Sequence, residues 1–163
     1  MKLTLTERWI LSNQYRILKA LHKGDDEFDQ ALEAIESGYE LEYDQLIPHI
    51  YADTFSREEC RRVRDIMAMF SVLKYSYNQL QEKTGIKQQD IIFDGFSGNE
   101  ETLHMAYTRW LYEDRRFRDL DRGDDFNSHF PTLERYTQML RIWESMGKKH
   151  ELTREEVIKI VSR

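Results

Sequence analysis

The chain has 163 residues, with 30 Asp and Glu against 24 Lys and Arg, and its formal net charge is −6 at pH 7. This length fits one domain, and the acidic balance argues against direct nucleic-acid binding, because phosphate-binding surfaces normally carry an excess of basic residues. A lone Cys60, the lack of an apolar signal-peptide stretch and a longest apolar run of only residues 66–70 predict a cytoplasmic protein that does not enter a membrane.

The chain is rarely interrupted by residues that stop helices. Only Pro48, Pro131 and seven glycines break it, and between them apolar side chains recur every three or four positions. We therefore expect an all-α fold, a single helical domain over residues 1–163 arranged as a bundle around a long central helix, with at most one minor extended segment.

The first helix is expected to begin at the capping box Thr4-x-x-Glu7 and to end near Gly24. Its inward stripe is predicted to hold Ile10, Leu11, Gln14, Ile17, Leu18 and Leu21. A second helix is expected over residues 26–37. Residues 39–43 alternate apolar and polar side chains, which suits a short extended segment, although one such segment without a partner does not define a sheet. Residues 46–51 suit a helical turn or two, bent at Pro48.

The central helix carries the strongest signal. A second capping box, Ser56-x-x-Glu59, opens it, and eight apolar positions follow at helical spacing until Gly85: Cys60, Val63, Ile66, Met67, Phe70, Leu73, Tyr77 and Leu80. A helix over about 57–83 would be roughly 40 Å long and would form the spine of the core.

The remaining chain is predicted to be helical after one buried connection. Residues 85–98 interrupt the helices, and their apolar centre at 91–93 indicates a buried segment. A helix then resumes behind a cap at Ser97 or Asn99 and frays into the charged run 113–125. Pro131 suits the first turn of another helix, which ends before Gly147, and a last short helix follows Thr153-x-x-Glu156.

One apparent catalytic motif set is excluded by its spacing. Ser71-x-x-Lys74, Ser76-Tyr-Asn78 and Lys83-Thr-Gly85 resemble the three signatures of serine penicillin-binding enzymes. Here all three lie within 15 residues of one helix and its cap, where successive positions point 100° apart, so the serines and the threonine cannot converge on one carbonyl carbon.

No metal, cofactor or catalytic group is assigned from the sequence. The five histidines are scattered, and the acidic segment beginning at Asp119 lacks the ligand pattern of a calcium loop. Two arginine clusters, at 57–64 and 115–122, alternate with acids, as solvated helix faces do. Asp and His side chains near residues 119–131 leave an unrecognised enzyme open as an alternative.

Polar residues on apolar faces define the candidate ligand site. An unpaired buried amide costs roughly 1 to 3 kcal/mol, so these side chains need partners, either backbone groups in connecting loops or a ligand in a cleft. If the first helix approaches the loop at 126–131, they would form a polar floor in an apolar cleft. The predicted ligand-binding residues are Asn13, Gln14, Tyr15, Asn127 and His129.

Self-association is also expected. The aromatic-rich helices that contain Trp110 and Trp143 offer more apolar surface than one short bundle covers, and symmetric dimers are the commonest outcome for such domains. We therefore expect a homo-oligomer, with a dimer preferred.

Several segments together resemble the YfbU family of bacterial cytoplasmic proteins. They are residues 10–18, Phe93-Asp-Gly-Phe96 with the nearby Gly-Asn-Glu, and 126–131 followed by Leu133-Glu-Arg-Tyr136 and Met139-Leu140, and they cover essentially the whole chain in consistent order. The resemblance brings no catalytic residues, because the family is uncharacterised. Some relatives join this domain to a helix-turn-helix segment, which implies a ligand-binding module; this chain leaves no room for such a segment, so we expect no direct role in transcription.

The sequence therefore favours a non-enzymatic protein. We expect a cytoplasmic helical binding or regulatory module that takes a small molecule or a protein partner, and the alternative is the enzyme with Asp and His side chains near residues 119–131.

Overall fold

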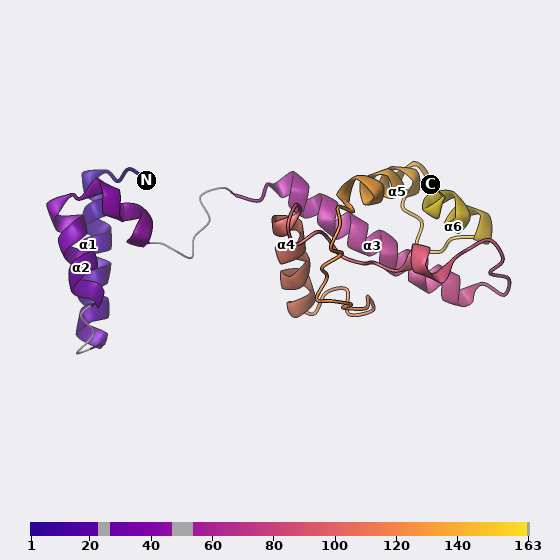
Figure 1. The fold of residues 1–163 in the computed structure, drawn as a ribbon, viewed down its shortest axis with the longest axis horizontal. Coiled ribbons are helices and arrows are strands. Elements are labelled where there is room, and N and C mark those ends of the chain that lie inside the picture. Colours follow the sequence, from indigo (N-terminus) through magenta and orange to yellow (C-terminus); the bar gives the residue numbers. More distant parts are fainter. Residues whose placement is uncertain (23–26, 47–53, 163) are drawn as a thin grey trace. The chain divides into compact units, whose positions relative to one another are not determined.

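The computed structural model describes residues 1–22, 27–46 and 54–162 (Figure 1). Within these ranges the secondary structure is helical, and the only β-type contact is an isolated bridge between Phe96 and Asn127, which confirms the all-α prediction. The chain divides into two compact units, Met1–Thr54 and Phe55–Arg163, which we describe separately. A single domain over residues 1–163 stays a prediction.

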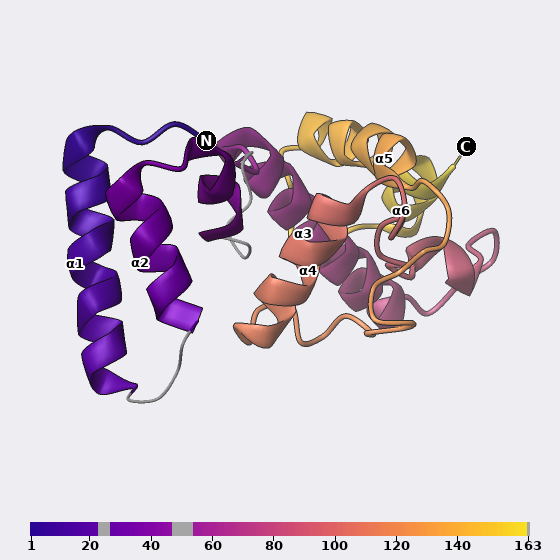
Figure 2. The ribbon, with the colours of Figure 1, turned by 60° about the vertical axis from the view of Figure 1, so that its left-hand side comes forward.

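The first unit is a pair of helices followed by a 3-10 helix. Helix α1 spans Leu5–Leu21, α2 spans Glu27–Ser37 and η1 spans Glu40–Leu46, and α1 lies alongside α2 in both ribbon views (Figures 1 and 2). The predicted capping box is present: the Thr4 side chain accepts a hydrogen bond from the Glu7 N–H, and the Thr4 N–H donates to the Glu7 carboxylate at 2.7 Å. The end predicted near Gly24 and the turns predicted at 46–51 lie largely outside the described residues.

The short extended segment that residues 39–43 were expected to suit is not formed, because residues 40–43 belong to η1. Gly38 ends α2 with φ +79°, and the Tyr39 N–H turns back to the carbonyl of Ala34. A lone strand here would leave its backbone groups unpaired, whereas a 3-10 helix pairs them locally and buries the Tyr43 side chain to 2% exposure.

The inward stripe predicted for α1 is wrong for much of its length. Ile10, Ile17 and Leu21 are 48%, 59% and 72% exposed. Polar contacts with α2 decide which side of α1 is covered: the Arg8 guanidinium donates to the carbonyls of Ile35 and Glu36, each at 2.8 Å, and the Ser12 hydroxyl donates to the Glu36 carboxylate at 2.7 Å. Apolar periodicity alone did not indicate that arginine and serine would face the neighbouring helix.

The second unit is built around α3, which spans Arg57–Gln79 and contacts the other helices of the unit (Figures 1 and 2). These are η2 (Gln88–Ile91), α4 (Thr102–Glu113), α5 (Leu133–Ser145) and α6 (Arg154–Val161). Half of the predicted capping box is present: the Ser56 side chain accepts from the Glu59 N–H, whereas the Glu59 carboxylate contacts Arg62 and His104. The helix ends four residues before the predicted position 83, because Leu80 already has an extended backbone.

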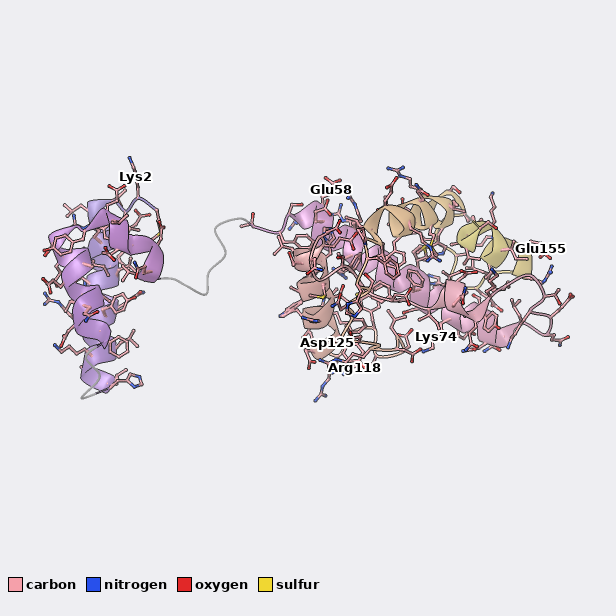
Figure 3. The ribbon with its side chains drawn as sticks, in the orientation of Figure 1. Lys2, Glu58, Lys74, Arg118, Asp125 and Glu155 are labelled. Atoms are coloured by element: carbon pink, nitrogen blue, oxygen red, sulfur yellow. The ribbon has the colours of Figure 1, made fainter. Side chains whose placement is uncertain are left out.

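An aromatic cluster fills the centre of this unit. The Phe70 side chain of α3 is fully buried, and its ring centroid lies 4.8 Å from that of Tyr136 and 5.3 Å from that of Phe93. Phe93 and Phe96 are also buried and come from the connection between α3 and α4, which was predicted to be buried. Charged side chains such as Glu58, Arg118 and Glu155 lie at the periphery (Figure 3).

The starts of α4 and α5 share one buried carboxylate. Glu101, 7% exposed, stands at the N-cap of α4 and accepts hydrogen bonds from the N–H groups of Ser97, Thr132 and Leu133 at 2.8 to 2.9 Å. Ser97, one of the two predicted caps, instead accepts from the N–H groups of Asn99 and Glu100 in the preceding turn. Helix α5 begins at Leu133 with Thr132 as its N-cap, so Pro131 lies one residue before the cap and not in the first turn, where it was predicted. Helix α6 carries the predicted capping box at Thr153.

No helix in the described ranges combines the length and the apolar character needed to cross a bilayer.

Replacing Phe70 by Ala should lower the free energy of unfolding by about 3 to 5 kcal/mol, because the side chain is buried among other rings and its loss leaves a cavity. Urea denaturation followed by circular dichroism measures this change. A loss below about 1 kcal/mol would show that the cluster is not the core of the unit.

Replacing Glu101 by Ala should cost on the order of 3 kcal/mol or more, because three buried or half-buried backbone N–H groups lose a charged acceptor. Glu100→Ala is the matched control, since Glu100 is the exposed neighbour. Equal denaturation midpoints for the two variants would contradict a structural role for the Glu101 carboxylate.

Candidate functional site

The predicted ligand-binding residues lie in both units. Asn13, Gln14 and Tyr15 belong to α1 of the first unit, and Asn127 and His129 belong to the loop before α5 in the second. Their convergence in one cleft stays a prediction, so we describe each group in its own unit.

The first unit contains a groove of about 780 Å³ between α1, α2 and η1. Two of the predicted residues, Gln14 and Tyr15, line it. The Tyr15 hydroxyl donates to the carbonyl of Leu46 at 3.1 Å, and its ring lies 6.3 Å from that of Phe28, so Tyr15 forms a positioned wall of the groove. Apolar side chains supply most of the remaining wall: Leu11, Leu18, Phe28, Ala31, Ala34 and Leu46.

The polar lining of this groove has a definite chemistry. It consists of the amides of Gln14, Gln30 and Gln45 and the carboxylates of Glu33 and Glu42, beside the tyrosine hydroxyls. Among the described lining residues there is no lysine, arginine or histidine. The amides offer hydrogen-bond donors and acceptors, and the carboxylates favour positive over negative charge.

Asn13 faces a different direction from Gln14. It lines a smaller cavity of about 280 Å³, together with Trp9, Ser12 and Arg16. The side chains of Asn13 and Gln14 point 100° apart around the helix, and that of Asn13 does not line the groove. The groove therefore includes Gln14 and Tyr15 without Asn13.

Asn127 ties two loops of the second unit together. Its side-chain oxygen accepts hydrogen bonds from the N–H groups of Gly98 and His129, each at 3.0 Å. The two loops approach closely: Gly95 has φ +90°, and a Cβ at this position would lie 2.0 Å from the carbonyl oxygen of Phe126. The side-chain oxygen of Asn127 thus pairs with backbone groups of the connecting loops, which was one of the two kinds of partner expected for it. Ligand binding by Asn127 stays a prediction.

His129 forms an exposed pair with an acid of the same loop. Its Nε2 atom lies 2.6 Å from the Asp124 carboxylate, and the two side chains are 66% and 74% exposed. The backbone of this region is unusual, since five non-glycine residues adopt positive φ: Arg115, Phe117, Asp125, Phe126 and His129. Such conformations persist only where surrounding contacts impose them. One such contact is the hydrogen bond from the Arg109 guanidinium to the carbonyl of Asp125 at 2.8 Å.

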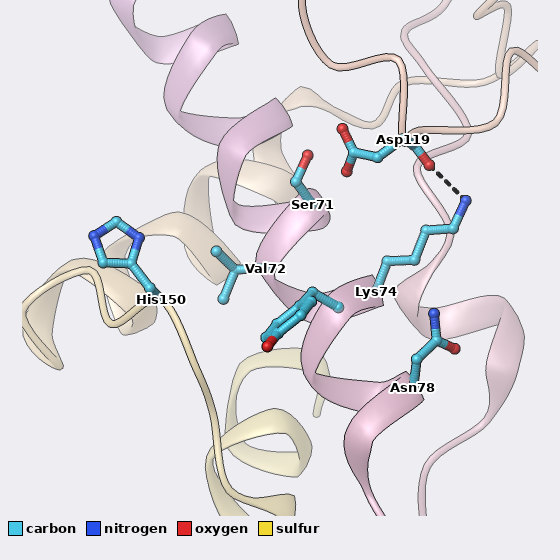
Figure 4. A pocket seen from close by; sticks show the side chains of 7 residues that line it. Ser71, Val72, Lys74, Asn78, Asp119 and His150 are labelled. Atoms are coloured by element: carbon cyan, nitrogen blue, oxygen red, sulfur yellow. Dashed lines mark hydrogen bonds between the residues drawn. The ribbon is translucent and has the colours of Figure 1, made fainter.

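A cavity of about 460 Å³ lies beside α3 in the second unit and was not predicted (Figure 4). The Lys74 ammonium donates to the carbonyl of Asp119 at 2.6 Å and contacts both oxygens of the Asp121 carboxylate at 3.1 Å, so its charge is already balanced. The buried Ser71 hydroxyl has no hydrogen-bond partner among the described residues.

The two serines of the apparent penicillin-binding motifs do not share this cavity. Ser71 lines it, whereas Ser76 is 1% exposed on another side of α3 and accepts a hydrogen bond from the Leu152 N–H at 3.0 Å. The divergence follows from helical geometry, as the spacing predicted.

Together the two units define an all-α protein with an acidic, amide-lined groove in one unit and an aromatic core around a long helix in the other. The chain belongs to the YfbU family, because the model of the YfbU domain matches residues 1–163. It is also 38% identical over 168 aligned residues to the UPF0304 protein MJECS11 of Methanocaldococcus jannaschii, an alignment that covers 98% of this chain and 99% of that relative. The resemblance drawn from the sequence is confirmed.

Replacing Asn127 by Ala should lower the free energy of unfolding by about 1 to 3 kcal/mol, because two backbone N–H groups lose their acceptor. Asn127→Asp keeps an oxygen at the same place and should cost much less. Urea denaturation of both variants is the measurement, and equal losses would show that the accepting oxygen is not what matters.

Proposed function

We propose that this protein is a binding module whose groove in the first unit holds a small molecule with an apolar body and an uncharged or cationic polar group. The observation that carries the proposal is the lining of the groove, in which apolar walls accompany amides and carboxylates without a described basic side chain. Its volume of about 780 Å³ falls within the range typical of small-molecule sites.

The charges of the groove argue for this ligand class. An anionic ligand would meet the Glu33 and Glu42 carboxylates without a compensating cation, whereas an amine or amide would find acceptors. The Gln45 amide already donates to the Glu42 carboxylate at 3.1 Å, which orients that carboxylate on the wall. Gln14, in contrast, is exposed and available to a ligand.

The enzymatic alternative near residues 119–131 has less support. Asp119 of this segment lines the cavity beside α3, where its backbone carbonyl accepts a hydrogen bond from Lys74. A general base works on a substrate held within hydrogen-bond reach. His129 and Asp124 are strongly exposed, and they line none of the three cavities described above.

The same proposal includes a cytoplasmic location, homo-oligomerisation and no direct contact with nucleic acid. The lone cysteine and the net charge of −6 support the first and the last of these. Of the two tryptophans from which self-association was predicted, Trp143 is buried and its indole N–H donates to the carbonyl of Lys149, whereas Trp110 is 54% exposed. Self-association is supported instead by the exposed apolar residues of α1.

The ligand proposal is tested by thermal melting of the full chain with pools of neutral, cationic and anionic metabolites. A ligand at about 100 times its Kd adds about 2.7 kcal/mol, which raises Tm by roughly 5 to 10 °C for a chain of this size. We expect a neutral or cationic pool to give this shift and Gln14→Ala to reduce it.

Gln81→Ala is the matched control, because Gln81 is an exposed glutamine of the second unit. Stabilisation by an anionic pool alone, or an equal effect of the two variants, would contradict the proposed groove.

A further inference from the structure

Helix α1 has a second face that is apolar and free of charge. Projected at 100° per residue, one arc of about 140° holds eight side chains and none of the charged residues of the helix. The eight positions are Thr6, Trp9, Ile10, Asn13, Gln14, Ile17, Ala20 and Leu21. The charged residues Glu7, Arg8, Arg16 and Lys19 all lie outside this arc.

The larger apolar side chains on this arc are exposed. Trp9 is 68% exposed and Ile17 is 59% exposed, and Ile10 and Leu21 expose about half or more of their surface. Single exposed apolar residues are common on proteins, but four on one side of one helix form a patch of the kind that marks an interaction surface.

The spacing along this arc is that of a paired helix. Thr6, Ile10, Asn13, Ile17 and Ala20 follow one another at intervals of four, three, four and three residues, which is the heptad pattern of helices that pack along their length. A polar asparagine in such a stripe fixes register, because its amide must find a partner in the facing helix.

The position of Asn13 indicates what the partner is. Residue 13 is the midpoint of α1, Leu5–Leu21, so a two-fold antiparallel pairing of two α1 helices brings Asn13 against Asn13 of the second copy. An amide both donates and accepts, so this contact satisfies itself. A foreign apolar groove would leave the amide unpaired. The same pairing places Trp9 opposite Ile17 and Thr6 opposite Ala20 of the second copy, and it opposes the helix dipoles.

We propose that α1 is a self-association surface, on which two copies of this chain pair in antiparallel orientation across Asn13. The inference rests on the self-association proposed above and names its surface. A helix of 17 residues is only about 26 Å long, so the interface lies near the lower end of specific interfaces, about 1,000 Å². We therefore expect a micromolar Kd.

Sedimentation equilibrium of the full chain tests the pairing. From about 1 to about 200 µM, the mass of the wild type should rise from 19.7 kDa toward twice that value. Trp9→Lys and Ile17→Lys should each raise the dimer Kd at least tenfold while leaving the circular dichroism melt unchanged, because both side chains are exposed.

Two matched controls place a lysine at other exposed apolar sites. Leu41→Lys changes an 85% exposed residue of η1, and Trp110→Lys changes the exposed tryptophan of α4. Both should leave the Kd within about twofold of the wild-type value. If the dimer is lost in Trp110→Lys and kept in the α1 variants, α1 is not the self-association surface, although the chain does self-associate. If the wild type stays monomeric, both the proposed surface and self-association are wrong.

Orientation is tested by disulfide trapping in a Cys60→Ser background. Thr6→Cys chains mixed with Ala20→Cys chains should cross-link to each other in the antiparallel pair, with little linkage within either type. Preferential linkage of Thr6→Cys chains to one another would overturn the antiparallel arrangement.

Discussion

The second unit depends on the carboxylate of Glu101. This carboxylate replaces the water that would otherwise solvate the first turn of α5. It accepts hydrogen bonds from the N–H groups of Thr132 and Leu133, which lie 31 and 32 residues further along the chain. No basic side chain is needed, because backbone donors and the positive end of the helix dipole supply the compensation. One acid thus fixes the start of α4 beside the start of α5.

The arrangement of the neighbouring loops depends on the Glu101 carboxylate. The Thr132 hydroxyl donates to the carbonyl of Gly95 at 2.8 Å and lies 3.3 Å from a Glu101 carboxylate oxygen, which draws the connection before α4 toward α5. Phe96 then exchanges backbone hydrogen bonds with the segment at 126–128, and its ring joins the cluster around Tyr136. Burial raises the pKa of the Tyr136 phenol, which keeps this hydroxyl neutral where it accepts from the Asp94 N–H.

The parts of the fold that could be predicted are those with local causes. The starts of α1, α3 and α6 were predicted because a capping serine or threonine and its glutamate lie three residues apart. Glu101 gave no such signal, since its partners are distant in sequence and it is one acid among many. In the site, Gln14 and Tyr15 do line a groove, but the covered side of α1 depends on contacts with α2 that periodicity does not encode. The cavity at Lys74 was missed because Asp119 and His150 reach it from other segments of the chain.

The attachment of α1 to α2 has a consequence for acidity. The Glu36 carboxylate accepts from both Ser12 and Arg16, and the hydrogen bond from Arg16, followed by that from Ser12, holds its pKa below the usual value of 4.5. A carboxyl group with a lowered pKa stabilises the folded state above its ordinary pKa, and that contribution is lost as the pH falls through the lowered value. The contact between α1 and α2 is therefore sensitive to acid at the Glu36 side chain, whose hydrogen bonds to Ser12 and Arg16 help to decide which face of α1 is covered.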